Sequence, residues 1–196
     1  TLERTTTGRG PVREHTLAEI RALSAGYPER FGPDFAGERV PTLAAVLGLL
    51  RGRARALIEI KHEAAAESDD GIEARAVAEV LRAGQAAQVA FLSFSKKALL
   101  RCRKHAPEVP RGHLFYRATA EEILAGAAEA ATDLVMPEKG LLNPDLVTRL
   151  QAARLRVATW VVDDAEELAA LRPYGLFGVG SNRPGVLIAA LADWTE

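Results

Sequence analysis

Short apolar runs alternate with stretches of helical periodicity along most of the chain, and this alternation constrains the fold more than any other feature. Neighbouring parallel strands need a long crossover connection, which is usually a helix. The pattern predicts six strands, each followed by a helix. The predicted strands cover residues 57–61, 88–94, 113–116, 134–136, 156–162 and 177–180.

Helix start signals follow several of the predicted strands. Thr119-Ala-Glu-Glu122 is a capping box, and Asn143-Pro144 places an N-cap before a proline at the first helical position. Further helices are predicted over residues 71–83, from Ser95 to 104, from Asp164 onward and over 184–191. Residues 1–40 are predicted to be irregular, apart from one helix that begins at Thr16. Another follows Pro41-Thr42, with Leu43, Val46, Leu47 and Leu50 on one face.

Six strand–helix units fit either an open doubly wound sheet or most of a (β/α)₈ barrel, which takes about 250 residues. The chain has 196 residues and opens on Thr1-Leu-Glu-Arg without a methionine. We therefore expect an α/β fold, an incomplete (β/α)₈ TIM barrel with six of its eight units. We expect a single domain over residues 1–196 whose first two strands would precede Thr1. The open edges should be the strands at 57–61 and 177–180.

Composition excludes several classes of protein. The 25 Lys and Arg residues against 26 Asp and Glu residues leave a formal charge of −1, which excludes broad electrostatic binding to nucleic acid or to an anionic membrane. Cys102 is the single cysteine, so neither an internal disulfide nor a cysteine-built zinc site is expected. We expect no membrane span, because the longest nearly apolar run, 41–50, is too short.

The strand at 57–61 carries the most informative pair of side chains. Ile58 and Ile60 should face one side of the sheet, and Glu59 and Lys61 the other. In a barrel the charged pair would point inward near the carboxyl end of the strand, where barrel active sites lie. Two interpretations stay open. The pair neutralises itself, or Glu59 binds a hard divalent cation while Lys61 binds an anion.

Several blocks, in order, give the chain a resemblance to a known family. The first block is Thr1-Leu2-x-Arg4-Thr5-Thr6-x-Gly8-x-Gly10-x-Val12. It is followed by Phe35-x-Gly37-Glu38-x-Val40-Pro41-Thr42-Leu43, Ile58-Glu59-Ile60-Lys61, Ser93-Phe94, Val157-Ala-Thr-Trp160 and the stretch 178–184. Together these blocks are similar to the glycerophosphodiester phosphodiesterases, and they cover nearly the whole chain.

The resemblance implies a (β/α)₈ barrel hydrolase of lipid and glycerol metabolism that converts glycerophosphodiesters into glycerol 3-phosphate and an alcohol with a divalent cation, Mg²⁺ or Ca²⁺. It implies that Glu59 is a metal ligand, that Lys61 lies near the phosphate and that Trp160 lines the substrate pocket. It also implies that the two acid/base histidines and two further metal ligands would lie before Thr1. No catalytic residue is therefore assigned to this chain, which we expect to be inactive alone.

The resemblance is incomplete at the rim of the site. The family often has Trp-Thr-Val-Asn where this chain has Trp160-Val-Val-Asp163, and Thr-Asp-x-Pro where this chain has Ser181-Asn-Arg-Pro184. Of the histidines, His62 is a candidate substrate contact, and His105 is expected to end a helix. His15 and His113 are expected to be structural or surface residues.

Two alternative functions stay open. The chain could be a truncated or degenerate homologue that acts as a binding protein, or it could belong to the related phospholipase D-like toxins, for which it offers no membrane-binding insertion. The expected partner is a small glycerophosphodiester and not nucleic acid. We expect a cytoplasmic location and self-association through open sheet edges.

Overall fold

The computed structural model describes residues 1–64 and 71–192, which fall into two compact units, residues 1–51 and 52–196. The expectation of a single domain over the whole chain stays a prediction. In the described ranges, no helix is long and apolar enough to cross a membrane.

The first unit holds short helices joined by irregular chain. They are a 3-10 turn at Val12–Glu14 and the helices α1 (Leu17–Ala22), α2 (Pro28–Phe31) and α3 (Leu43–Leu50). The predicted capping box at Thr16 forms with Glu19. The sequence analysis missed α2, which begins at a proline and is held by edge-to-face contacts of the Phe31 ring with Tyr27 and Phe35.

The second unit is built on a six-stranded parallel sheet whose strands lie in the order of the sequence. This order confirms the predicted barrel-type arrangement, because a doubly wound sheet reverses its strand order near the middle. The strands are β1 (Ala56–Glu59), β2 (Val89–Ser93), β3 (Arg111–Phe115), β4 (Leu134–Pro137), β5 (Arg156–Trp160) and β6 (Gly178–Gly180).

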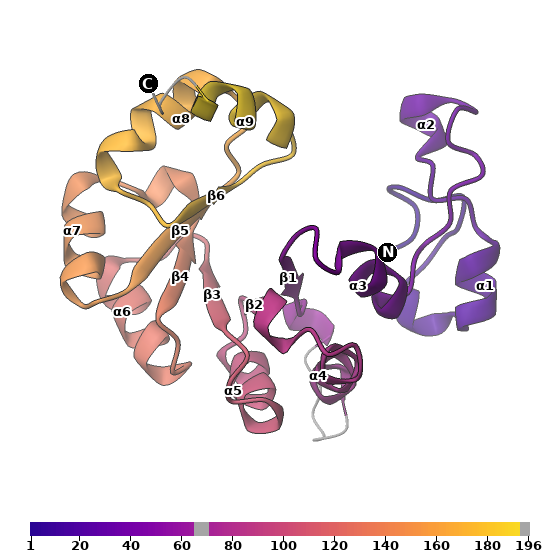
Figure 1. Ribbon diagram of the computed structural model, residues 1–196, viewed down its shortest axis with the longest axis horizontal. Coiled ribbons are helices and arrows are strands. Elements are labelled where there is room, and N and C mark those ends of the chain that lie inside the picture. The colour runs from indigo at the N-terminus through magenta and orange to yellow at the C-terminus, as the bar shows by residue number, and fades with distance from the viewer. Residues whose placement is uncertain (65–70, 193–196) are drawn as a thin grey trace. The chain divides into compact units, whose positions relative to one another are not determined.

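A helix follows each strand and lies on the outer side of the curved sheet (Figure 1). Crossovers of one hand between sequential strands place all helices on the same face, as in part of a barrel wall. The helices are α4 (Ile72–Arg82), α5 (Lys96–His105), α6 (Ala120–Glu129), α7 (Pro144–Ala152), α8 (Ala165–Leu171) and α9 (Pro184–Ala192). Short 3-10 turns lie at His62–Ala64, Ala86–Gln88, Lys139–Leu141 and Arg172–Tyr174.

Side chains alternate between the two faces of this sheet. Residues such as Val135 and Val157 on the outer face pack against Ile123 of α6 and Leu150 of α7. On the inner face, Leu92, Leu114, Leu134, Met136 and Ala158 form a second apolar layer, which Trp160 covers. The predicted alternation in the first strand agrees with this pattern, since Ile58 pairs with the fully buried Phe91 and Glu59 with Leu92 of the inner layer.

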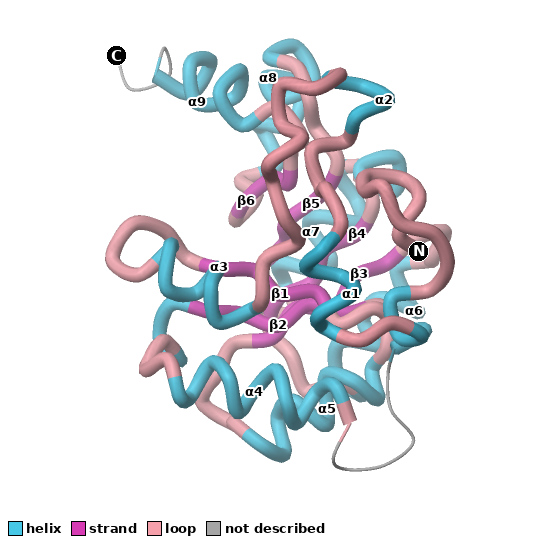
Figure 2. The backbone as a smooth tube through the Cα atoms, turned by 90° about the vertical axis from the view of Figure 1, so that its right-hand side faces the viewer, coloured by secondary structure: helices cyan, strands magenta, loops and turns pink. Residues whose placement is uncertain are grey.

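The α4–α5 contact contains a buried charged group. The two helices lie side by side in both views (Figures 1 and 2), and Glu73 of α4 lies 3.9 Å from the guanidinium of Arg101. Cys102 of α5 is buried. Desolvation is the main cause that raises the pKa of its thiol to about 12, and the nearby Glu73 carboxylate adds to the shift. Cys102 is thus a packing residue, since a protonated buried thiol is a poor nucleophile.

Candidate active site at the carboxyl ends of the strands

A hollow of about 620 Å³ opens at the carboxyl ends of β1, β2, β3 and β5. The side chains that line it come from residues at these strand ends or just beyond them. They are Glu59, Lys61, His62, Glu63, Phe94, Tyr116 and Trp160. The three site residues that the resemblance implies, Glu59, Lys61 and Trp160, line this one hollow, and so does the candidate substrate contact His62.

Strand register explains why these side chains share one face. Glu59 pairs with Leu92, Leu92 with Gly112, and Ala158 with Gly178. Side chains two residues apart on a strand face the same way. Phe94, Tyr116 and Trp160 each follow a residue of the inner apolar layer by two positions, so they extend that layer toward the carboxyl edge.

Glu59 and Lys61 form an ion pair. The Lys61 Nζ atom donates to Glu59 Oε2 over 2.7 Å. The Lys61 side chain is 66% exposed and the Glu59 side chain is 30% exposed. Backbone bonds hold the chain between them, because Ile60 N donates to Leu92 O at 2.8 Å and the buried Ser93 hydroxyl donates to Ile60 O at 2.7 Å. A water-exposed pair of this kind contributes little to folding stability, about 0–1 kcal/mol.

Phe94, Tyr116 and Trp160 line the same hollow as this ion pair and are called the aromatic wall. The Phe94 and Trp160 rings meet edge to face, with centroids 5.8 Å apart and planes at 88°. The Trp160 indole N–H donates to Met136 O over 2.9 Å, which fixes the ring on the sheet. Phe94 and Tyr116 were not predicted to line the site, although the recurrence of an aromatic residue at the carboxyl ends of β2, β3 and β5 is a signal that the sequence contains.

The rim beyond β5 and β6 is tied together by Asp163. Its carboxylate accepts hydrogen bonds from the Asn182 amide side chain at 3.0 Å, the Asn182 backbone N–H at 2.7 Å and the Ser181 hydroxyl at 3.0 Å. The hydrogen bond from the Asn182 side chain is the main cause that lowers the pKa of the Asp163 carboxyl group. The two positions at which the chain differs from the resembled pattern are thus hydrogen-bonded to each other in this structure.

The residues present do not by themselves fit a divalent cation. In the part of the chain that the structure describes, no three His, Cys, Asp or Glu side chains converge as metal ligands. Glu59 offers one carboxylate, and its oxygen is engaged with Lys61. A hard cation needs about six oxygen ligands, so no catalytic step is derived through a metal here.

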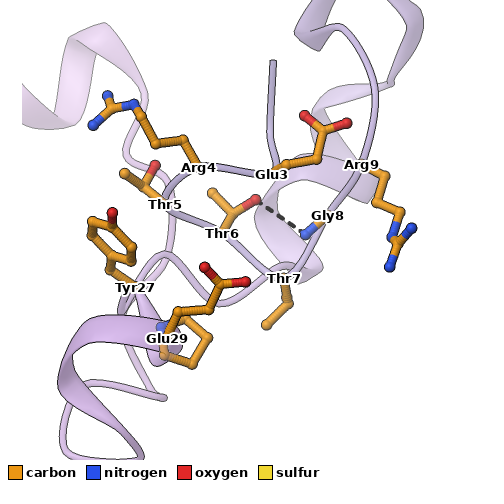
Figure 3. Close-up of a pocket in the computed structure, with 10 residues that line it drawn as sticks. Glu3, Arg4, Thr5, Thr6, Thr7, Gly8, Arg9, Tyr27 and Glu29 are labelled. Carbon is orange, nitrogen blue, oxygen red and sulfur yellow. Dashed lines mark hydrogen bonds between the residues drawn. The ribbon is translucent and has the colours of Figure 1, made fainter.

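A second hollow of about 470 Å³ lies in the first unit, between the loop 3–9 and the start of α2. It contains two arginines and three threonines, but Arg4 and Arg9 point to opposite sides of the loop (Figure 3). The Thr6 hydroxyl accepts a hydrogen bond from Gly8 N at 3.1 Å and donates to Leu2 O. These groups stabilise the loop and do not converge on a ligand.

The histidines occupy different environments. His62 lines the hollow of the second unit and lies 3.3 Å from Glu63, and His105 ends α5 as predicted. His113 is buried on the outer side of β3, with Nδ1 3.2 Å from Gly126 O and Nε2 3.3 Å from Phe94 O. Its role is structural, as the sequence analysis expected.

A curved parallel sheet in sequential strand order, with outer helices and a hollow at its carboxyl edge, has the architecture of a (β/α)-barrel wall. The model of the glycerophosphoryl diester phosphodiesterase family matches residues 1–186. The glycerophosphodiester phosphodiesterase of Bacillus subtilis is 29% identical over 93% of this chain and 67% of its own length. That of Caldanaerobacter subterraneus is 30% identical over 96% and 76%.

Solved structures agree with these relatives. The crystal structure of a glycerophosphodiester phosphodiesterase from Agrobacterium tumefaciens superimposes with a TM-score of 0.79 at 27% identity. The match covers 96% of this chain and 78% of that one. The chain belongs to the glycerophosphoryl diester phosphodiesterase family.

His113 should make folding stability depend on pH. Burial lowers the pKa of its imidazole below the ordinary value of 6.5, so the folded state disfavours the proton that the unfolded chain accepts. Its contribution to stability is therefore complete above pH 6.5 and is lost as the pH falls below that value. Urea unfolding at several pH values should show a smaller acid-side loss in His113→Gln than in the unaltered chain.

The matched control is His15→Gln, in the first unit. It should leave the pH dependence of the second unit's unfolding unchanged. An unaltered acid-side loss in His113→Gln would show that the burial of this imidazole does not control the effect.

Proposed function

We propose that the protein to which this chain belongs hydrolyses glycerophosphodiesters to glycerol 3-phosphate and an alcohol. The observation that carries the proposal is the family match over residues 1–186, and the hollow at the carboxyl edge supports it. In this reaction the oxygen of water bonds to phosphorus, the bond from phosphorus to the alcohol oxygen breaks, and the alcohol leaves with a proton.

Lys61 is the proposed phosphate ligand of this site. Its ammonium is mostly exposed and lies at the hollow, where a phosphodiester anion competes with Glu59 for the same charge. A charge-assisted hydrogen bond from Lys61 would strengthen as negative charge builds up on the phosphoryl oxygens. Trp160 is proposed to hold the organic part of the substrate against its ring.

Glu59 is the proposed ligand for a divalent cation, Mg²⁺ or Ca²⁺, together with ligands from outside the described residues. The cation would supply positive charge to the phosphoryl group. If phosphate takes the Lys61 ammonium, the Glu59 oxygen is released from its present partner. Substrate and cation are then expected to favour each other's binding.

The acid and base of the reaction are not assigned to this chain. Among the described residues that line the hollow, His62 is the one imidazole, and it is paired with Glu63. We propose that the 196-residue chain binds glycerol 3-phosphate without hydrolysing diesters, and that a longer protein, extended before Thr1 by a segment with the family's histidines, would hydrolyse them. The cytoplasmic location stays a prediction.

Two substitutions separate the proposed roles. Lys61→Met should weaken glycerol 3-phosphate binding about tenfold, the value of one charge-assisted hydrogen bond, and should not weaken cation binding, because it releases the Glu59 oxygen from its ion pair. In the longer protein, Glu59→Gln should weaken Mn²⁺ binding, measured by the paramagnetic broadening of NMR signals, and lower the rate. Titration calorimetry measures the phosphate term, and a coupled assay for glycerol 3-phosphate measures the rate.

Glu121→Gln, on the outer helix α6, is the matched control and should change neither quantity. If no glycerophosphodiester is hydrolysed by the longer protein, the chain is better described as a binding protein. If Glu59→Gln leaves both cation binding and rate unchanged, Glu59 and Lys61 form an ion pair and no more.

We also propose that the isolated chain self-associates through its sheet edges. Among the described residues, β1 and β6 each pair with one neighbouring strand, and exposed apolar side chains lie beside them, Leu57 in β1 and Phe177 before β6. Such edges pair with other chains. The sedimentation coefficient of the unaltered chain should rise with concentration. The rise should be smaller in Leu57→Lys, whereas the outer-helix control Ile188→Lys should show the same rise as the unaltered chain. A monomer at all concentrations would contradict this.

A further inference from the structure

The aromatic wall has little hydrogen-bonding capacity to offer a substrate. Phe94 has no polar atom, and the single donor of Trp160 is already bound to Met136 O. The Tyr116 hydroxyl is the wall's one other polar side-chain group. A leaving alcohol rich in hydroxyl groups would lose hydrogen bonds to water here and regain few, which costs free energy.

The wall offers ring faces and edges instead. Phe94 is 36% exposed and Tyr116 55% exposed, although both carry large apolar rings. The Arg117 guanidinium carbon lies 5.1 Å from the centroid of the Tyr116 ring, so a cation already rests on one of these rings. Aromatic faces attract cations through the ring quadrupole, and groups of aromatic rings bind quaternary ammonium ions.

The charges around the hollow match a zwitterionic substrate. Two carboxylates, Glu59 and Glu63, line it with one lysine, Lys61. With Lys61 directed to a phosphate and Glu59 to a cation, Glu63 is the lining carboxylate left to attract a positive charge, and the Arg117 guanidinium already contacts the Tyr116 ring. A quaternary ammonium has no N–H donor, so burying it against a wall with few acceptors leaves no donor unpaired.

We propose that Phe94, Tyr116 and Trp160 select glycerophosphodiesters whose alcohol carries a quaternary ammonium group. For the reaction itself, this proposal rests on the proposed function. The phosphate binds beside Lys61, and the ammonium lies against the aromatic wall. The wall thereby determines specificity, whereas Lys61 determines phosphate affinity.

Binding to the chain tests the wall without turnover. The sequence has two tryptophans, so a Trp194→Phe background leaves Trp160 as the fluorescent reporter. Choline and 3,3-dimethylbutanol have the same shape and differ in charge. Choline should quench Trp160 fluorescence and bind about fivefold more tightly than 3,3-dimethylbutanol, as a cation–π contribution requires. Equal affinities would overturn the proposal, because the wall would then be an apolar surface alone.

Variants locate the effect. Tyr116→Leu and Phe94→Leu each remove a ring and keep an apolar side chain, and each should reduce the preference for choline. Tyr116→Phe keeps the ring and should retain it. Circular dichroism spectra check that each variant folds. A choline preference that survives both leucine variants would contradict the assignment.

Turnover by the longer protein separates this proposal from the general one. Glycerophosphocholine should have a higher kcat/KM than glycerophosphoglycerol, and Tyr116→Leu should reduce the ratio while glycerophosphoglycerol hydrolysis continues. Hydrolysis of both diesters at equal kcat/KM would overturn the aromatic selection and keep the phosphodiesterase. Hydrolysis of neither would overturn the proposed function, whereas choline binding would still test the wall.

Discussion

The parallel pairing of six strands in sequential order is the constraint on which the site depends. Parallel strands end at the same edge of their sheet, so residues that lie far apart in the sequence meet there. Glu59 and Trp160 are separated by four helical crossovers and still line one hollow. The backbone hydrogen bonds between strands and the Ser93 hydroxyl bond to Ile60 O fix the strand ends. The positions of the Glu59–Lys61 pair and of the aromatic wall follow from these fixed strand ends.

The Glu59–Lys61 contact links the architecture to the proposed chemistry. In the structure each charge is satisfied by the other, which removes the cost of an unpaired charge at a partly covered position. The pair is exposed enough to exchange partners, because a solvent-exposed ion pair is held by about 1 kcal/mol or less. A phosphate on one side and a cation on the other could replace it with no change in the strand.

Local sequence signals predicted much of the fold. Thr119, Asn143 and Asp164 cap their helices through side-chain bonds to the third helical residue, and the order of the strands followed from their alternation with helices. The helix at Pro28 was missed because its ring contacts are tertiary. Alternation placed Glu59 and Lys61 together, but spacing alone could not distinguish an ion pair from a metal and phosphate site. Nor could it show that Asn182 donates a hydrogen bond to Asp163 across the rim.

The central claim is that the carboxyl-edge hollow binds the phosphate product. A ¹⁵N chemical-shift map of the chain titrated with glycerol 3-phosphate tests this most directly. The account predicts saturable shifts at the backbone amides of residues 59–63 and at the Trp160 indole N–H, with small changes on the outer helices. Saturable shifts confined to the loop at residues 3–9, or shifts absent from residues 59–63, would contradict it.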